Sequence, residues 1–213
     1  MNTGEPSMGT DPPLSVLVDR TRGLQPWRKL FHAASGLTVA GLLLFLVPFR
    51  SLAPAILGGL FVLLLGLDFL RLSRSSLNHL FFRWFQLLAS PREAEGIASS
   101  TWFVGGCFFA VLFPTDAAVA GILVLALSDP AASVAGYLWG RRPLGTGTVE
   151  GALVFGGLTF LILVALGLVG WGPALVIAAI VSVLECFPGP VDDNLLVPVA
   201  VAVLVWVPMG LLG

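Results

Sequence analysis

An acidic side chain stands in the middle of an apolar run. Asp129 lies within Leu127-Ser-Asp-Pro-Ala-Ala-Ser133, inside a stretch long enough to cross a membrane. A carboxylate in such a stretch costs about 2.5–3.5 kcal/mol, so it normally has a partner or a function. Pro130 has no backbone N–H, so we expect a broken helix whose new N-terminus can hold an anion. The alternative is a kinked span with small residues for tight packing.

A second acidic cluster surrounds the stiff turn Pro188-Gly-Pro190, with Glu185 before it and Asp192, Asp193 and Asn194 after it. Carboxylate and amide oxygens suit Mg²⁺, which takes one or two carboxylates together with substrate phosphates. The carboxylates expected to bind this metal are Asp129, Glu185, Asp192 and Asp193. We expect Asp129 and Asp193 to be catalytic as well. The alternative for Asp193 or Asn194 is a helix cap.

A glycine-rich basic loop, Gly140-Arg-Arg-Pro-Leu-Gly-Thr-Gly-Thr-Val-Glu-Gly151, lies between these clusters. Arginines offer paired donors to phosphate oxygens, and glycines let backbone N–H groups approach an anion. The loop is not a P-loop, because it has no Lys and no preceding strand. The candidate nucleotide-binding residues here are Ser133, Arg141, Arg142, Gly145, Gly147, Thr148 and Glu150. A flexible basic loop is the alternative. Glu150 could bind metal or order the loop, or it could equally be an acid favoured in the first turn of a helix.

Basic residues also open the first apolar run, as Arg28-Lys-Leu-Phe-His32. Arg28 and His32 are four residues apart and therefore share a helix face. We expect Arg28 and Lys29 to bind nucleotide, Asn194 to assist them, and His32 to be catalytic. The alternative is a basic pair reaching to the membrane interface beside an interfacial histidine.

Composition decides which elements must hold these residues. The chain is 57% hydrophobic and only 11% charged, with a mean hydropathy of +0.96. A soluble domain carries about 25% charged residues, so this surface must largely face lipid. The net charge of −1 is not the excess of positive charge that nucleic-acid-binding proteins carry, so we expect no nucleic-acid partner.

Apolar runs predict an all-α, polytopic membrane helix bundle of about seven spans. The expected spans are 29–48, 52–71, 97–113, 116–138, 151–169, 172–187 and 194–212. An amphipathic helix near 77–88 is expected to lie in the interface. Residues 1–27 form a polar, partly disordered segment, and 28–213 a single transmembrane domain.

The orientation follows from the basic residues. With a cytosolic N-terminus, ten of the eleven Lys and Arg residues fall on the cytosolic side, leaving only Arg50 outside. We therefore expect an integral protein of the cytoplasmic (inner) membrane whose polar site faces the cytosol. A transporter should also line a path to the other side, and spans 151–169 and 194–212 are almost purely apolar. This asymmetry favours an enzyme over a small transporter.

The clusters, in this order, resemble the CTP-dependent polyprenol kinase family, which includes dolichol kinase, phytol kinase and CTP-dependent diacylglycerol kinase. The motifs are Arg28-Lys29-x-x-His32-x-x-x-Gly36, Ser128-Asp129-x-Ala-Ala-Ser133-x-x-Gly136-x-x-x-Gly140, Thr148-Val-Glu150-Gly151 and Glu185 with Asp192-Asp193-Asn194-Leu195-x-x-Pro198. The resemblance covers most of the chain from Arg28 to Pro198, and the last motif is the most specific.

Two positions depart from the family pattern. The family usually has Gly before the Asp of the second motif, where this chain has Ser128. It usually has Lys shortly before the Glu-Gly of the third, where this chain has Thr146 or Gly147. We therefore expect nucleotide binding to rest more on Arg141 and Arg142.

The resemblance implies Mg²⁺-dependent transfer of the γ-phosphoryl group of CTP to the hydroxyl of a membrane lipid alcohol. The acceptor could be a polyprenol, a phytol-like alcohol or diacylglycerol, because apolar walls discriminate chains weakly. The alternative enzyme is a CTP-dependent phosphatidate cytidylyltransferase. That family's closing Gly-His-Gly-Gly stretch is absent here, and Asp-Asp-Asn-Leu stands in its place.

Overall fold

The structure is a computed structural model that describes residues 12–187, 189 and 191–212. Helices make up nearly all of it, which confirms the predicted all-α class. The helices are α1 (Leu14–Asp19), α2 (Pro26–Phe45), α3 (Val47–Ser73), α4 (Ser75–Phe85), the 3-10 helix η1 (Pro91–Ala94), α5 (Ser99–Ala110), α6 (Thr115–Trp139), α7 (Val149–Leu166), α8 (Trp171–Cys186) and α9 (Asp193–Leu212). A short antiparallel hairpin joins α6 to α7 through β1 (Pro143–Leu144) and β2 (Gly147–Thr148).

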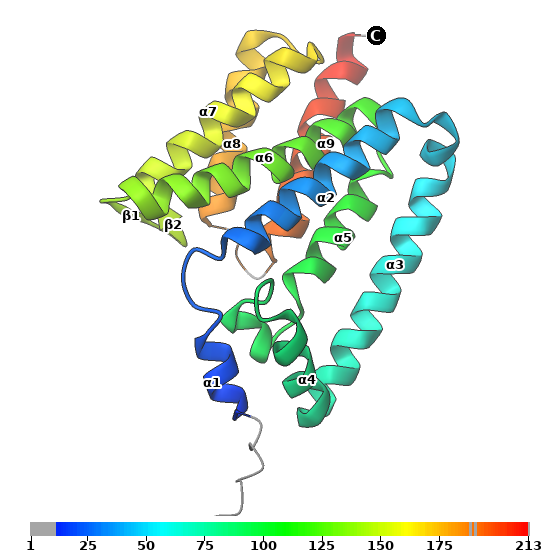
Figure 1. Cartoon of the computed structure of the whole chain (residues 1–213). Coiled ribbons are helices and arrows are strands. Elements are labelled where there is room, and N and C mark those ends of the chain that lie inside the picture. The colour runs from blue at the N-terminus through cyan, green and yellow to red at the C-terminus, as the bar shows by residue number, and fades with distance from the viewer. Residues whose placement is uncertain (1–11, 188, 190, 213) are drawn as a thin grey trace, which may run out of the picture.

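Helix α6 is the centre of the bundle and packs against α2, α7 and α9 (Figure 1). Small residues make these close approaches possible. A Cβ on Gly36 of α2 would lie 2.6 Å from the Ala126 Cβ of α6. A Cβ on Gly121 of α6 would overlap the backbone carbonyl of Pro198 in α9. The polar residues of these three helices are therefore brought close together.

The predicted break in α6 is wrong. Helix α6 continues through Pro130 from Thr115 to Trp139, so no new N-terminus forms beside Asp129. Proline removes one backbone hydrogen bond from a helix interior. Packing on three sides offsets that loss, since 61% of the most apolar window of α6 is buried.

Each of the seven predicted spans contains a helix. Among the described residues, α3, α6 and α7 are long and apolar enough to cross a membrane, and α8 and α9 are shorter apolar helices. These observations support an α-helical membrane bundle. The predicted span 97–113 is only partly helical, because α5 has 12 residues and is about 18 Å long. It is therefore shorter than the apolar core of a bilayer, which is about 30 Å thick.

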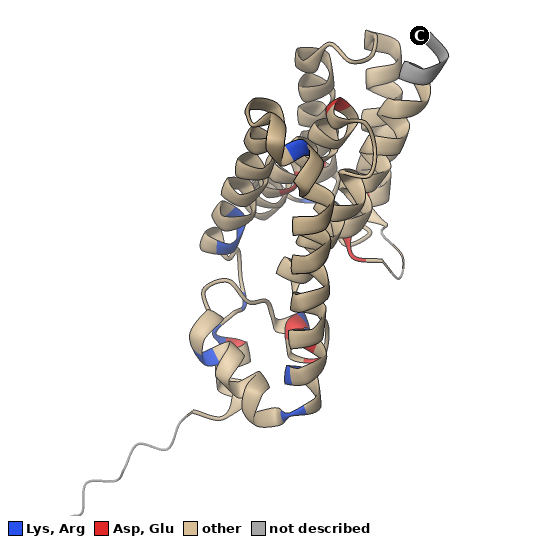
Figure 2. Cartoon of the chain, turned by 90° about the vertical axis from the view of Figure 1, so that its right-hand side faces the viewer, with Lys and Arg blue, Asp and Glu red and all other residues tan. Residues whose placement is uncertain are grey.

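The two ends of the bundle differ in character. Helix α1 lies at one end and the last turns of α9 at the other (Figure 1). Figure 2 shows Lys, Arg, Asp and Glu gathered mainly in the lower and middle parts of the molecule, with the upper helices almost free of charge. The charged residues are thus gathered toward the end of the bundle that carries α1.

The polar end is ordered by a small apolar cluster. Leu17 of α1 packs with Phe82 of α4 and with Ala89, so residues 14–19 are helical within the segment expected to be partly disordered. Residues 1–11 lie outside the described part of the chain. Helix α4 covers most of the segment predicted as an amphipathic helix near 77–88; it buries Phe82, whereas Trp84 is 75% exposed.

A buried ion pair anchors α3 to this end. Arg71 Nε lies 2.6 Å from Asp68 Oδ1, and the two residues are three apart, so their side chains share one face of α3. Arg71 also donates to Asn78 Oδ1 and to the carbonyl of Glu93, at 2.8 and 2.7 Å. Thr101 Oγ1 donates to Asp68 Oδ2 at 2.6 Å. Both charged side chains thus find their hydrogen-bonding partners within the protein. The pair also fixes residues 86–98, the connector between α4 and α5 that includes η1.

Candidate active site

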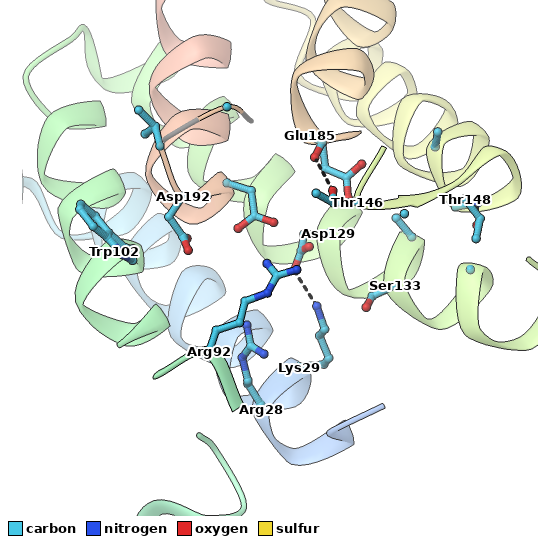
Figure 3. Close-up of a pocket in the computed structure, with 18 residues that line it drawn as sticks. Arg28, Lys29, Arg92, Trp102, Asp129, Ser133, Thr146, Thr148, Glu185 and Asp192 are labelled. Atoms are coloured by element: carbon cyan, nitrogen blue, oxygen red, sulfur yellow. Dashed lines mark hydrogen bonds and ion pairs between the residues drawn. The ribbon is translucent and has the colours of Figure 1, made fainter. Parts of the chain in front are cut away.

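A polar cavity of about 620 Å³ opens where α2, α6, the hairpin and the α8–α9 connection meet (Figure 3). That volume lies in the range of small-molecule sites, which is about 300–1,000 Å³. The charged and hydroxyl-bearing residues that line it are Arg28, Lys29, Arg92, Asp129, Ser133, Thr146, Thr148, Glu185, Asp192 and Asp193. Three of the four clusters expected from the sequence therefore share one cavity with part of the fourth, the basic loop.

Lys29 and Asp129 form an ion pair at the wall of this cavity. Lys29 Nζ of α2 lies 3.3 Å from Asp129 Oδ2 of α6, and their side chains are only 17% and 13% exposed. The pair offsets the cost of placing a carboxylate within an apolar helix. It exists because Gly36 lets α2 pack closely on α6.

Asn194 ties together the two carboxylates that precede it. Its Nδ2 donates to Asp192 Oδ1 at 2.7 Å and to Asp193 Oδ1 at 3.1 Å. Its backbone N–H also donates to Asp192 Oδ1 at 3.0 Å, which is the bond of a helix N-cap. The cap of α9 is therefore Asp192, whereas the sequence suggested Asp193 or Asn194. Asn194 is 3% exposed and does not line the cavity, so it positions the carboxylates.

The hairpin closes another side of the cavity. Thr146 donates to the Cys186 carbonyl through its backbone N–H, at 3.0 Å, and its Oγ1, at 3.2 Å. Gly145 has φ +56°, and a Cβ there would overlap the same carbonyl, so this turn requires glycine. Thr148 Oγ1 caps α7 by accepting from Gly151 N at 3.1 Å. Gly145 thus shapes the turn, while Thr146 and Thr148 line the cavity.

Five predicted binding residues lie outside the cavity lining, namely Arg141, Arg142, Gly145, Glu150 and Asn194. Arg141 and Arg142 are exposed, and their backbone N–H groups donate to Glu150 Oε2 at 3.1 and 3.5 Å. Glu150 therefore orders the loop, which is one of the alternatives considered for it. The structure does not bring these arginines to the other site residues.

Arg92 of η1 takes a place that the sequence analysis did not assign. It lines the cavity, and in Figure 3 it points toward the region of Lys29 and Asp129. The sequence marks Arg92 only as a cytosolic cation after the amphipathic helix. Its position depends on η1, which no hydropathy pattern predicts.

Glu93, the next residue, holds Arg28 in place through Ser99. Ser99 Oγ donates to Glu93 Oε1 at 2.8 Å and accepts from Arg28 Nη2 at 3.1 Å. Burial raises the pKa of the Glu93 carboxyl above its ordinary value of 4.5. Hydrogen bonds from Ser99 and the charges of Arg28 and Arg71 oppose that shift. Arg28 is thus held by a hydrogen-bonded chain that starts in the connector.

His32 lies behind the cavity wall. It is 5% exposed, its ring centroid is 5.1 Å from that of Phe103, and Asn194 is its hydrogen-bonding neighbour. It does not line the polar cavity. The structure therefore places His32 where it can support the Asp192–Asn194 group from behind.

The carboxylates fit a metal that arrives with a substrate. Across residues 12–187, 189 and 191–212, no group of three or more His, Cys, Asp or Glu side chains could hold a metal ion alone. The predicted cluster of four carboxylates is therefore not a preformed metal centre. Mg²⁺ bound to nucleotide phosphates needs only one or two carboxylates. Asp129 and Asp193 line the same cavity and repel each other, which a divalent cation would relieve.

Positions 188 and 190 of the expected Pro-Gly-Pro turn lie outside the described residues, while Gly189 between them lines the cavity. Ser133 and Gly147 also line it, as expected for nucleotide-binding residues.

Comparison with known proteins identifies a relative. No family model and no solved structure matches the chain. The chain is 33% identical over 116 residues to a protein of Eremothecium gossypii named CTP-dependent diacylglycerol kinase 1. The match covers 54% of this chain but 36% of the relative, so the chain spans little more than a third of that relative's length. The match supports the resemblance drawn from the four clusters, and over the matched residues the chain is similar to a CTP-dependent lipid kinase.

Proposed function

We propose that this protein is a lipid-alcohol kinase that transfers the γ-phosphoryl group of CTP to the hydroxyl of a membrane lipid alcohol. The observation that carries the proposal is the polar cavity in which the Lys29–Asp129 pair meets Asp193 and the cations Arg28 and Arg92. The name of the relative supports CTP as donor and a lipid as acceptor.

The side chains match what phosphoryl transfer requires. The reaction asks for positioning and neutralisation of phosphate charge more than for covalent chemistry. Arg28, Lys29 and Arg92 are the cavity's cations, and they can contact the phosphate oxygens. Glycines and small residues in the α6–α7 wall allow close approach of the nucleotide. Asp129 and Asp193 are the carboxylates placed to serve the acceptor hydroxyl and the metal.

Transfer of the γ-phosphoryl group from CTP to the alcohol needs no further reactant. The acceptor oxygen bonds to the γ-phosphorus, the bond to the β–γ bridging oxygen breaks, and CDP leaves. The hydroxyl proton passes to a carboxylate of the Asp129 and Asp193 pair. Mg²⁺, when bound, neutralises charge on the transferring phosphoryl group. The residues that would hold it with the phosphates are Asp129, Glu185, Asp192 and Asp193.

The position of the cavity suits reactants from two phases. It lies at the starts of α2, α7 and α9 and beside the second half of α6, and α6 and α7 are two of the three candidate membrane spans. A nucleotide from water and an alcohol from the bilayer can meet there. We propose a cytosol-facing site in the cytoplasmic membrane, with the acceptor drawn from polyprenols, phytol-like alcohols and diacylglycerol.

The test is an assay of purified protein in mixed micelles with γ-labelled CTP, Mg²⁺ and a panel of lipid alcohols. We expect labelled lipid phosphate, release of CDP, and a higher rate with CTP than with ATP at matched concentration. Pyrophosphate release with a cytidine-linked lipid would instead identify a cytidylyltransferase. No nucleotide turnover with any acceptor would favour a transporter or scaffold.

A further inference from the structure

A second cavity, of about 250 Å³ and with mostly apolar walls, lies between α2, α3, α4 and α5. Its apolar lining includes Phe31, Leu64, Leu67, Phe81, Phe85 and Leu88. The phosphate chemistry proposed above does not use it. A hollow of this kind inside a membrane bundle can hold part of a lipid chain.

The apolar cavity continues to the outer surface of the bundle. A groove of about 420 Å³ between α2 and α4 shares Phe31, Phe85 and Leu88 with it. Trp27 and Trp84 flank this groove and are 60% and 75% exposed. Tryptophans concentrate at the level of lipid headgroups. The groove therefore opens where the hydroxyl end of a membrane lipid lies.

The inner end of the apolar cavity meets the polar cavity at Arg28, which lines both. Arg28 is held by Gln25 Oε1, 2.8 Å from Nη1, and by Ser99 Oγ, 3.1 Å from Nη2. Its buried Nε has no hydrogen-bond partner among the described residues. Arg28 is therefore a cation held in a fixed position where the two cavities meet, and its Nε–H remains available as a hydrogen-bond donor.

The ionised groups of the apolar cavity favour a neutral lipid head. Asp68 and Arg71 neutralise each other, with the further hydrogen bonds described above. Glu93 Oε1 accepts a hydrogen bond from Ser99 Oγ. Besides Arg28 and these groups, the lining holds the polar residues His32, Ser100 and Thr101, and the rest of the wall is apolar. A hydroxyl is therefore a better match for this cavity than a phosphate.

We infer that this apolar cavity holds the part of the acceptor's hydrocarbon chain nearest its hydroxyl, with the groove between Trp27 and Trp84 as its entry. The inference rests on the proposed function, and it places the hydroxyl beside Arg28 at the mouth of the polar cavity. It also predicts that α3 and α4, which carry none of the family motifs, select the acceptor together with the part of α2 that lines the groove.

Two neighbouring leucines of α3 provide a matched test. Leu64 lines the apolar cavity, whereas Leu63 lines neither apolar space and is 58% exposed. Leu64→Trp should raise the KM for the alcohol about tenfold, since it displaces roughly two methylene groups of chain. It should leave the KM for CTP unchanged, and Leu63→Trp should change neither. Equal lipid kinetics in both variants would overturn the inference while leaving the kinase assignment standing.

A binding experiment needs no turnover. A lipid alcohol with a diazirine in its chain is irradiated with the wild type in mixed micelles, and adducts are mapped by mass spectrometry. We expect adducts at Leu64, Phe85 or Leu88 that excess unlabelled alcohol removes. Adducts confined to lipid-facing positions such as Leu63 would contradict the assignment. If the wild type phosphorylates no alcohol, the proposed function fails, and the adduct map still decides whether the cavity takes a chain.

Discussion

Lys29 Nζ and Asp129 Oδ2 lie 3.3 Å apart although 100 residues separate them in the chain. The two side chains join α2 to α6 and are largely buried, yet both line the polar cavity. An ion pair that served only to hold two helices together would not need to face a cavity with further carboxylates and cations. The pair can therefore stabilise the packing of α2 on α6, take part in catalysis, or do both. A single substitution distinguishes these roles.

Asp129→Asn should abolish most turnover without loss of folded protein. The amide oxygen can still accept from Lys29, and a neutral side chain is cheaper in a membrane helix than a carboxylate. Loss of a general base alone lowers rates by about 10²–10⁴. The measurement is turnover together with yield and thermal stability in detergent. Asp116→Asn, at the exposed far end of the same helix, is the control and should match the wild type.

The opposite pattern would assign the pair to structure. If Asp129→Asn lowers yield and thermal stability while the surviving protein keeps its rate, the carboxylate serves only as the partner of Lys29.

Asp193→Asn should lower turnover and raise the Mg²⁺ concentration needed for half-maximal rate. An amide replaces a helix cap well and a metal ligand badly. Since Asp192 accepts the capping hydrogen bond from Asn194, the start of α9 should be unaffected. The measurement is a Mg²⁺ titration of initial rates. An unchanged titration curve with a normal maximal rate would remove Asp193 from the metal site.

Arg92→Ala should raise the KM for CTP more than the double variant Arg141→Ala with Arg142→Ala. Arg92 lines the polar cavity, and the other two arginines do not. A charge-assisted hydrogen bond contributes about 1.5–3 kcal/mol, which corresponds to a change of roughly 10–100-fold. Steady-state kinetics with CTP varied at saturating alcohol give the comparison. A larger effect from the double variant would return phosphate binding to the basic loop, as the sequence analysis expected.

The Glu93 carboxyl should make thermal stability depend on pH. Burial raises its folded-state pKa above 4.5, so the folded protein binds more protons than the unfolded chain near that pH. Stability should therefore fall as pH rises from 4.5 through the raised pKa, and then level off. Glu93→Gln should flatten this dependence. Melting curves of both proteins in detergent across the range provide the check, and parallel curves would contradict it.

The polypeptide should have its N-terminus in the cytosol and its C-terminus outside. Ten of the eleven basic residues lie on the expected cytosolic side. Reporter fusions at each end, active in one compartment only, measure this. A C-terminal reporter active in the cytosol would contradict it and would imply an even number of spans.

Some properties of this protein follow from the sequence by itself. Runs of apolar residues predict where helices form, because a bilayer leaves the backbone no other partners. A carboxylate at Asp129 and adjacent carboxylates at Asp192 and Asp193 are costly in such a chain, so their presence marks the site. The cost of placing a charge in an apolar segment also points to Lys29, at the start of the first apolar run. The structure brings these four residues to one cavity.

Other properties were decided only by the tertiary structure. Residue spacing gives distances along one helix, whereas the approach of one helix to another depends on where small residues let backbones meet. Gly36 on Ala126 brings Lys29 to Asp129, and packing on three sides keeps α6 unbroken at Pro130. The η1 connector, fixed by Arg71 and Glu93, puts Arg92 at the cavity in place of Arg141 and Arg142. Such contacts join segments far apart in the chain, and local propensity carries no information about them.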